Sequence, residues 1–482
     1  MIAVRPVIFI LGLLVAALGV AMLVPLAVDL TAGRYDWRVF LVSFLAAEAL
    51  GGLLAFGSAG GAMALSLRQG FLLTTAAWMV LSAVGALPLV FSELDLSYTD
   101  AFFETISGLT TTGSTILTGL DDMPPGILLW RAMLQWFGGV GIIVMGIAML
   151  PYLRVGGMQL FRMESSDRSE KVLPRATQLA GATSIAYFAL TAACALAYFS
   201  AGMTGFEAVA HAMTTVSTGG YSTSDASLGH FQSPLIEWIA TVFMALGALP
   251  FALYFQLARG HLSAIGENSQ VRMFFRGLVI AVLGVTLWLW VASDASLADA
   301  LRLAAFHVTS VVTTTGYASD DYQLWGGFAV LVFFFLTFVG GCTGSTAGGI
   351  KVLRFELIAR VIRTQARRLT QPHGVFPMSY GGRALSEDVT TSAMNFVFVF
   401  FAAFCLLTLA LAATGLDFTT AFSGAVTALA NVGPGLGDRI GPAGNFAALP
   451  DTAKWLLSLG MLLGRLEFFT VLVLMTPAFW RG

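Results

Sequence analysis

A short motif that occurs four times decides the fold: Thr110-Thr111-Thr112-Gly113, Ser217-Thr218-Gly219-Gly220, Thr313-Thr314-Thr315-Gly316 and Ala430-Asn431-Val432-Gly433. Each copy follows a short apolar stretch and precedes a long one, and the closing glycines stand at near-equal intervals along the chain. Regular spacing of one motif is the mark of an internal repeat. We therefore expect four copies of one structural unit, each with a loop that ends in glycine.

The composition places these units in a membrane. The 482 residues are 57% hydrophobic and 11% charged, with a mean hydropathy of +0.82, whereas a soluble globular protein has about 25% charged residues. Seven blocks carry no charge, at 7–28, 71–92, 132–153, 176–206, 238–258, 322–350 and 389–416, and 39–67, 277–293 and 455–480 are almost as apolar. A helix of about 20 apolar residues crosses a bilayer. The sequence predicts an all-α polytopic membrane protein with ten spans.

The charged residues predict the orientation of the spans. Lys and Arg gather in three alternate loops, at 154–175, 259–276 and 351–383, while the loops between them hold Asp and Glu. Basic loops remain in the cytoplasm. We therefore expect a cytoplasmic N-terminus and four motifs that face outside. The first block is longer than a signal peptide's apolar region, so we expect it to be a transmembrane helix. The three cysteines lie far apart in apolar segments and predict neither a disulfide framework nor a metal site.

Before each motif lies a helix-like run that is too short to cross, at 99–109, 206–216, 297–312 and 418–429. Such a segment enters the membrane and returns only where protein or water shields its backbone. A residue with a hydroxyl group stands six positions before each closing glycine: Ser107, Thr214, Ser310 and Thr427. In the second motif this holds for Gly220 and not for Gly219, so Gly220 is taken as the equivalent glycine. The predicted unit is helix, pore helix, loop and helix around one axis. Its copies span 69–155, 170–260, 271–370 and 384–482, after an N-terminal helix pair at 1–68.

Four such loops are suited to binding a dehydrated cation. Backbone carbonyls from converging loops replace the water shell of an ion, and glycine reaches the backbone angles that this needs without strain. The C-terminus of each pore helix adds about −0.5 charge. Small residues where helices pack closely are the alternative for a single motif, but they do not explain four. The predicted selectivity filter consists of Thr111, Thr112, Gly113, Thr218, Gly219, Gly220, Thr314, Thr315, Gly316, Asn431, Val432 and Gly433.

At these residues the chain resembles the Trk/Ktr/HKT superfamily of potassium transporters, specifically the TrkH type. Two further segments carry the resemblance, Gly340-Gly341-Cys342-Thr343-Gly344-Ser345-Thr346-Ala347-Gly348-Gly349-Ile350-Lys351 and Asn431-Val432-Gly433-Pro434-Gly435-Leu436-Gly437. It implies potassium uptake across a bacterial inner membrane, with K+ as the transported ion and no other cofactor. It also implies a homodimer with one pore per subunit and a cytoplasmic nucleotide-binding partner of the TrkA type. All four filter glycines are present, which resembles the potassium-selective pattern.

Two features suggest gates. Five glycines within 340–349 should break the surrounding helix, since each costs about 1 kcal/mol relative to alanine, and should leave a loop at membrane depth. We expect this loop, with Gly340, Gly341, Thr343, Gly344, Ser345, Thr346, Gly348 and Gly349, to obstruct the pore; close helix packing is the alternative. A charge within a span usually faces a cavity or a partner. We expect Arg465 to lie in the ion path, the alternative being an ion pair between helices. Glu467 stands only two residues away and is not an obvious partner.

The remaining polar residues predict no other chemistry. We expect His211 and His307 to be buried in pore-helix packing and Glu48 to pair within the N-terminal helices. Paired catalytic carboxylates, metal-ligand spacing, a nucleophile motif and a phosphate-binding Gly-Lys-Ser/Thr ending are not found in the sequence, so a membrane enzyme is a weak alternative. The other alternative is the ion-binding subunit of a potassium-pumping ATPase complex. The net charge of −2 gives no indication of a nucleic acid partner.

Overall fold

The computed structural model describes residues 3–60, 65–149, 172–261, 263–380, 383–385 and 387–481. This part of the chain is helical apart from one hairpin of β1 (Ser379–Tyr380) and β2 (Arg383–Ala384). Seven described helical segments are long and apolar enough to cross a membrane, at Arg5–Thr31, Trp37–Ser58, Leu67–Phe91, Pro125–Ile143, Ala180–Ser200, Ser269–Ala292 and Asp388–Ala413. The predicted helical membrane fold is therefore confirmed.

Three of the ten predicted spans are broken: the break at the glycine-rich segment 340–349 is the expected one, and the sequence did not predict the other two. Pro250 lies in the break between α11 (Pro234–Gly247) and α12 (Phe251–Ala258), and the two helices are bent by 93°. Helix α21 (Asp451–Arg465) meets the segment from α22 (Phe469–Leu472) to Met475 at 105°. In the third case α16 (Gly327–Thr337) ends before the glycine-rich loop that leads to α17 (Val352–Thr370).

One order of elements occurs four times: a long helix, a short helix, an irregular loop and a second helix. The four long helices, with the short α5 after the first, are α4 (Leu67–Gly85) with α5 (Leu87–Phe91), α9 (Val172–Ser200), α14 (Ser269–Ala292) and α18 (Glu387–Ala413). The short helices are α6 (Tyr98–Leu109), α10 (Gly205–Val216), α15 (Leu297–Val312) and α19 (Phe418–Ala430), and the second helices are α7 (Pro125–Met149), α11, α16 and α21. The short helices lie within one residue of their predicted bounds.

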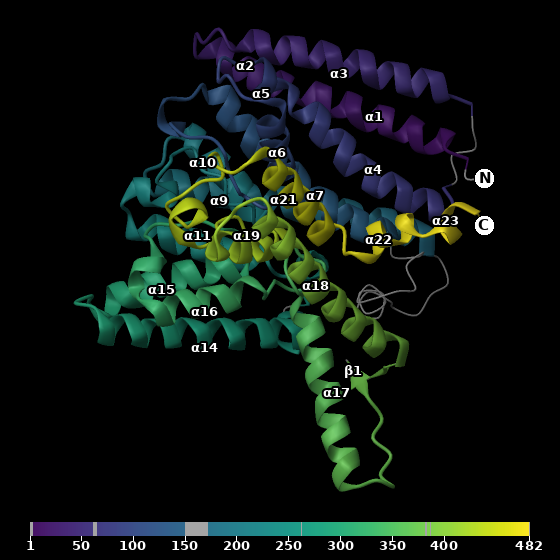
Figure 1. Cartoon of the computed structure of the whole chain (residues 1–482), viewed down its shortest axis with the longest axis vertical. Coiled ribbons are helices and arrows are strands. Elements are labelled where there is room, and N and C mark those ends of the chain that lie inside the picture. The colour runs from purple at the N-terminus through teal and green to yellow at the C-terminus, as the bar shows by residue number, and fades with distance from the viewer. Residues whose placement is uncertain are drawn as a thin grey trace.

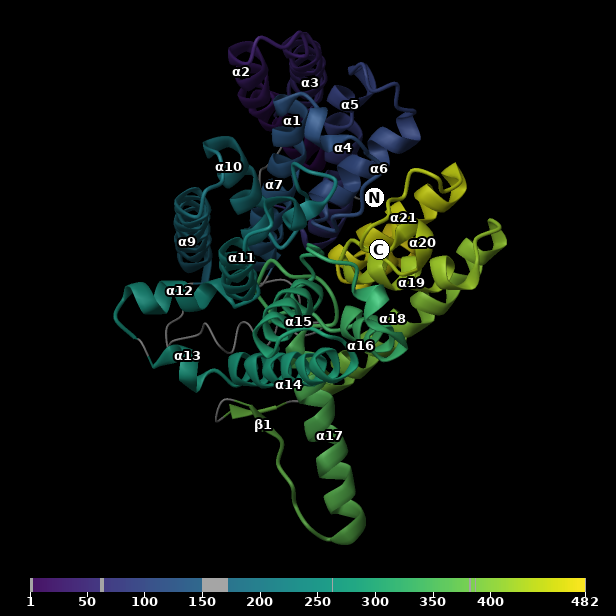
Figure 2. The same ribbon diagram turned by 90° about the vertical axis from the view of Figure 1, so that its left-hand side faces the viewer.

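The four groups form a ring. Contacts join α7 to α10, α11 to α15, α16 to α19 and α21 to α6, so each group touches the next and the fourth touches the first. Figure 2 shows this arrangement, with the N-terminal helices outside the ring. Helix α17 and the hairpin project away from the body of the molecule (Figure 1). Most of the basic loop 154–175 lies outside the described residues.

The N-terminal helices pack tightly through small residues. Helix α1 (Arg5–Ala21), which continues as α2 (Leu23–Thr31), lies against α3 (Trp37–Ser58). A Cβ at Gly12 would come within 2.7 Å of the Gly51 carbonyl oxygen. Close backbone approach of this kind is typical of helices in membranes. Glu48 lies against Gly19 in this pair, but its Oε1 has no hydrogen-bond partner, so the ion pair expected for it is not present among the described residues.

Candidate functional site

The four short helices end in the same hydrogen-bonded turn. The residue two positions before each glycine has a positive φ of 52–59°: Thr111, Thr218, Thr314 and Asn431. The N–H of the following residue donates to the carbonyl six positions before the glycine, in the pairs Thr112–Ser107, Gly219–Thr214, Thr315–Ser310 and Val432–Thr427, at 2.8–3.1 Å. This is the Schellman arrangement that ends helices. The register that the hydroxyl residues predicted, with Gly220 equivalent to the other glycines, is the one observed.

Three of these left-handed residues are threonines, which is unusual. A β-branched residue with positive φ is a backbone outlier, and such strain gathers at functional sites. The fourth loop has asparagine there, a residue that tolerates this conformation well. The Asn431 amide donates to Thr112 Oγ1 at 3.0 Å and to the Met461 carbonyl at 2.9 Å. The departure of the fourth motif from Thr-Thr-Gly therefore gives a polar connection between the fourth loop and the first.

The four glycines close a ring of loops. Their φ values are +84° at Gly113, +80° at Gly220, +82° at Gly316 and +113° at Gly433. A Cβ on each glycine would collide with a carbonyl oxygen of the next loop, in the order Gly113 with Gly219, Gly220 with Thr315, Gly316 with Val432 and Gly433 with Thr112. We call these four carbonyl oxygens, of Gly219, Thr315, Val432 and Thr112, the junction oxygens. Because the order returns to its start, the four loops surround one axis.

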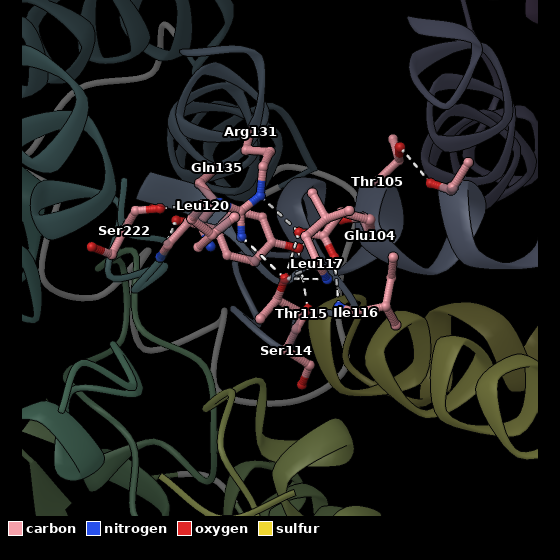
Figure 3. Close-up of polar contacts among 12 residues, drawn as sticks. Glu104, Thr105, Ser114, Thr115, Ile116, Leu117, Leu120, Arg131, Gln135 and Ser222 are labelled. Atoms are coloured by element: carbon pink, nitrogen blue, oxygen red, sulfur yellow. Dashed lines mark hydrogen bonds and ion pairs between the residues drawn. The ribbon is translucent and has the colours of Figure 1, made fainter. Parts of the chain in front are cut away.

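A buried ion pair that was not predicted from the sequence supports the first two loops. Arg131 Nε of α7 lies 2.8 Å from Glu104 Oε1 of α6. The Arg131 side chain is 1% exposed and the Glu104 side chain 0%. Glu104 also accepts from the Ile116 N–H, and Arg131 donates to the Ser222 carbonyl. Figure 3 shows Glu104 and Arg131 meeting from their two helices beside residues of the first and second loops. The signal in the sequence was a charged residue in each of the two apolar helices that flank the first loop.

Gln135, one helical turn beyond Arg131, was also missed. Its Nε2 donates to the Gly219 carbonyl at 2.6 Å, and its Oε1 accepts from the Tyr221 N–H at 3.0 Å. Tyr221 lies under the Arg131 guanidinium, 4.2 Å from ring centroid to Cζ. Helix α7 therefore holds the second loop with two side chains on one face.

The two predicted histidines are buried and serve packing. His307 Nε2 accepts from the backbone N–H groups of Ser319 and Asp320, so its Nδ1 donates to the Leu303 carbonyl. His211 lies in the same way between the Glu207 carbonyl and Ser222 Oγ. Each ring thus joins a short helix to the segment after its loop. Within the described residues, no group of three His, Cys, Asp or Glu side chains could hold a metal ion.

The glycine-rich segment forms a closed loop at the broken helices. Its two ends pair through Gly340 N–H to the Ile350 carbonyl and Ile350 N–H to the Phe338 carbonyl, each at 3.0 Å. In its middle, Cys342 N–H donates to the Ala248 carbonyl, and the Gly344 carbonyl accepts from Phe251 N–H. These bonds join the loop to the break between α11 and α12. The loop is therefore shielded by protein, as irregular backbone at membrane depth requires.

This loop contacts the ends of three short helices. Thr346 Oγ1 lies 3.1 Å from the Val216 carbonyl and 3.2 Å from Thr218 Oγ1. The Gly348 N–H donates to Thr314 Oγ1 at 2.7 Å, and a Cβ at Gly348 would collide with the Ala430 carbonyl. The loop therefore lies against the second, third and fourth Schellman turns, at the C-terminal ends of α10, α15 and α19.

Arg465 joins the same loop to α7. Its Nη1 donates to the Thr346 carbonyl at 2.8 Å and its Nη2 to the Gly138 carbonyl at 3.2 Å, while its Nε has no partner. The side chain is buried, and in the described part of the chain it has no acidic partner, so the alternative of an ion pair for Arg465 is not observed. Glu467 pairs with Arg354 instead, at 2.9 Å. The two predicted gates thus form one hydrogen-bonded unit.

The N-terminal ends of two short helices carry ionised carboxylates. Asp417 caps α19, and a hydrogen bond from Thr420 lowers its pKa. In the first turn of α15, a hydrogen bond from Ser296 lowers the pKa of Asp299. Carboxylates with lowered pKa keep their charge as the solution becomes more acidic. Their negative charge also stabilises the positive N-terminal end of each helix. The opposite end of each helix, with its negative partial charge, faces the ring.

Known proteins match the chain over nearly its full length. The family profile described as "TrkH: Cation transport protein" matches residues 37–481. The Trk system potassium uptake protein TrkI of Halomonas elongata is 48% identical over 99% of this chain and 97% of its own length. The TrkH protein of Escherichia coli is 42% identical over 99% of both chains. The crystal structure of the potassium transporter TrkH from Vibrio parahaemolyticus aligns with a TM-score of 0.92 at 38% identity, over 100% of each chain.

Proposed function

This chain belongs to the TrkH family of cation transport proteins, and from that premise we propose that it takes up potassium ions through the ring of four loops. It is a transporter and not an enzyme. The relatives that cover its whole length are named Trk system potassium uptake proteins. The observation that carries the proposal is the closed order of contacts in which each filter glycine meets a junction oxygen of the next loop.

In the proposed filter, backbone oxygens of the four motifs replace the hydration shell of one K+ ion at a time. The residues are those of the four motifs: Thr111, Thr112, Gly113, Thr218, Gly219, Gly220, Thr314, Thr315, Gly316, Asn431, Val432 and Gly433. Four helix C-termini directed at the ring favour a cation over an anion. An inside-negative potential supplies about 2.3 kcal/mol per 100 mV for each ion. That energy drives accumulation without a chemical reaction in this chain.

The proposed gate is the loop 340–349 together with Arg465. Contacts of Thr346 and Gly348 with the Schellman turns put the loop directly beside the filter. The Arg465 guanidinium, bound to the Thr346 carbonyl, adds a positive charge that repels a passing cation. Opening therefore requires that the loop part from Thr218 and Thr314 and that Arg465 release Thr346. Loop movement and withdrawal of the charge are one event in this proposal.

The proposed assembly follows the resemblance and the charge pattern. The chain divides into an N-terminal pair at 1–68 and repeats at 69–155, 170–260, 271–370 and 384–482. It lies in a bacterial inner membrane with its N-terminus in the cytoplasm, as the basic loops indicate. It forms a homodimer and binds a TrkA-type regulatory subunit on the cytoplasmic side. The exposed arginines of the projecting α17 support such a contact.

Ion flux in liposomes tests the proposal. Purified protein is reconstituted without ATP, an inside-negative potential is imposed, and uptake of radioactive rubidium and sodium is measured. We expect rubidium uptake that potassium inhibits and that exceeds sodium uptake. A requirement for ATP hydrolysis would instead support the ATPase-subunit alternative, and equal uptake of both ions would contradict a potassium filter.

A further inference from the structure

The second loop differs from the other three at one position of the ring. Where the first, third and fourth loops have Thr112, Thr315 and Val432 just before the closing glycine, the second has Gly219. Gly219 does not have a positive φ, so its backbone does not explain the missing side chain. A Cβ there would collide with the Gln135 side chain, with Cγ at 2.9 Å. Glycine at 219 therefore makes room for Gln135.

The Gln135 side chain is fully buried and uses both ends of its amide. Its Oε1 accepts from the Tyr221 N–H, which fixes the direction of the amide, because a backbone N–H can only donate. Its Nε2 donates at 2.6 Å to the junction oxygen of Gly219. The two hydrogen bonds therefore hold the residues directly before and after Gly220, which are Gly219 and Tyr221. Within the described residues, no hydrogen bond reaches the junction oxygens of Thr112, Thr315 or Val432.

We propose that Gln135 is a selectivity-determining positioning residue, which holds one of the four junction oxygens back from the ion. This inference rests on the proposed potassium filter. A donated hydrogen bond occupies one lone pair of the carbonyl and pulls the oxygen away from the axis. Sodium is smaller than potassium and needs its oxygens to move inward. Because the number and field strength of the coordinating carbonyls determine the preferred ion, a restrained oxygen favours the larger cation.

The neighbours of Gln135 make this restraint stiff. Arg131, one turn earlier on α7, donates to the Ser222 carbonyl and lies over the Tyr221 ring. The Tyr221 hydroxyl donates to the Glu104 carbonyl at 2.7 Å. Figure 3 shows Gln135 and Arg131 extending from the same helix toward the second loop. The oxygen of Gly219 is therefore bound to a side chain whose own surroundings are fixed by a buried ion pair.

The test compares rubidium and sodium uptake in liposomes for the wild type, Gln135→Met and Gly219→Ala. Methionine keeps the volume of the side chain without the amide, and alanine at 219 displaces the amide from the other side. A hydrogen bond contributes about 0.5–1.5 kcal/mol net. We therefore expect the ratio of rubidium to sodium uptake to fall by up to about tenfold in each variant. Loss of all rubidium uptake in Gln135→Met would make Gln135 a residue of the fold only and would overturn the inference.

Gln69→Met is the matched control. Gln69 is also buried, accepts from one backbone N–H (Ser66) and donates to one backbone carbonyl (Ala3), but it lies at the start of α4. Its loss should change the ratio little. If the wild type prefers rubidium and Gln135→Met and Gly219→Ala keep its ratio, the inference about Gln135 is overturned and the filter stands. If the wild type shows no preference, the filter proposal fails and this inference fails with it. An equal drop in Gln69→Met would assign the effect to lost stability and would overturn the inference too.

Discussion

At the residue scale, Gly316 explains why each loop ends in glycine. Its φ is +82°, and a Cβ there would collide with the Val432 carbonyl and lie 2.9 Å from Pro434 Cδ. The left-handed conformation alone costs a residue with a Cβ about 1–2 kcal/mol. Since 1.4 kcal/mol corresponds to tenfold in an equilibrium, we expect Gly316→Ala to reduce rubidium uptake by about tenfold or more.

A second glycine gives the control for this variant. Gly284 lies on the exposed face of α14, and a Cβ there would meet no atom within 4 Å. Gly284→Ala should therefore transport rubidium as the wild type does, at equal amounts of protein in the membrane. Transport by Gly316→Ala at the wild-type rate would show that the third loop does not belong to the ion path.

Arg465 gives the second prediction at this scale. Its guanidinium donates to the Thr346 and Gly138 carbonyls and has no acidic partner among the described residues. Arg465→Ala removes a buried positive charge and one anchor of the loop, so we expect rubidium flux through the isolated protein to rise several-fold. Arg276→Ala, at an exposed position of α14, should leave the flux unchanged. A folded Arg465→Ala protein with lower flux would make Arg465 a structural residue only.

The residues of the four motifs, which could be predicted from the sequence, recur in every repeat, and the site residues that could not be predicted occur in one repeat only. Backbone-determined features, such as the four glycines and the hydroxyl register, recur in the chain and could be aligned with one another. Gln135, Glu104 and Arg131 occur in one repeat only, so no internal comparison marked them. Their importance comes from partners in other segments, such as the Gly219 and Ser222 carbonyls, which only the folded structure brings near.

At the scale of elements, the short helices are fixed at both ends by local sequence. Ser97, Thr204, Ser296 and Asp417 each accept the N–H three residues later, and the Schellman turns close the opposite ends. Local signals of this kind made the bounds of these helices predictable. The break after α16 was predicted from the five glycines at 340–349, but the bends after α11 and α21 were not, because an apolar block has the same composition whether its helix is straight or bent.

The glycine-rich loop carries the prediction at this scale. It is bound to the second and third Schellman turns through Thr346 and Gly348, and its ends pair with each other. Deletion of the residues between the paired ends should remove these contacts and leave the flanking helices joined. We expect the deletion variant to conduct rubidium several-fold faster in liposomes, with the same preference over sodium. An unchanged flux in a variant that elutes and melts as a folded protein would reject the loop as a gate.

At the scale of the whole molecule, the ring is held by ion pairs between neighbouring groups. Lys454 of α21 pairs with Asp100 of α6, which connects the fourth group to the first. Arg302 of α15 pairs with Glu237 of α11, which connects the second group to the third. Both pairs join the second helix of one group to the short helix of the next. The ring of loops, and with it the proposed filter, therefore depends on all four groups at once, and none of them could form it alone.

This shared dependence predicts that the transported ion stabilises the entire fold. An ion that binds only the closed ring favours the folded state by RT ln(1 + [K+]/Kd), which is about 2.7 kcal/mol at a hundredfold excess over Kd. We expect the purified wild type to melt at a higher temperature in potassium chloride than in sodium chloride of equal ionic strength. Gly316→Ala, whose ring is obstructed at one junction, should lose this difference while Gly284→Ala keeps it. Because the comparison holds ionic strength constant, surface ion pairs are screened equally in both salts. Identical melting of the wild type in the two salts would mean that the four loops hold no potassium when the protein is at rest.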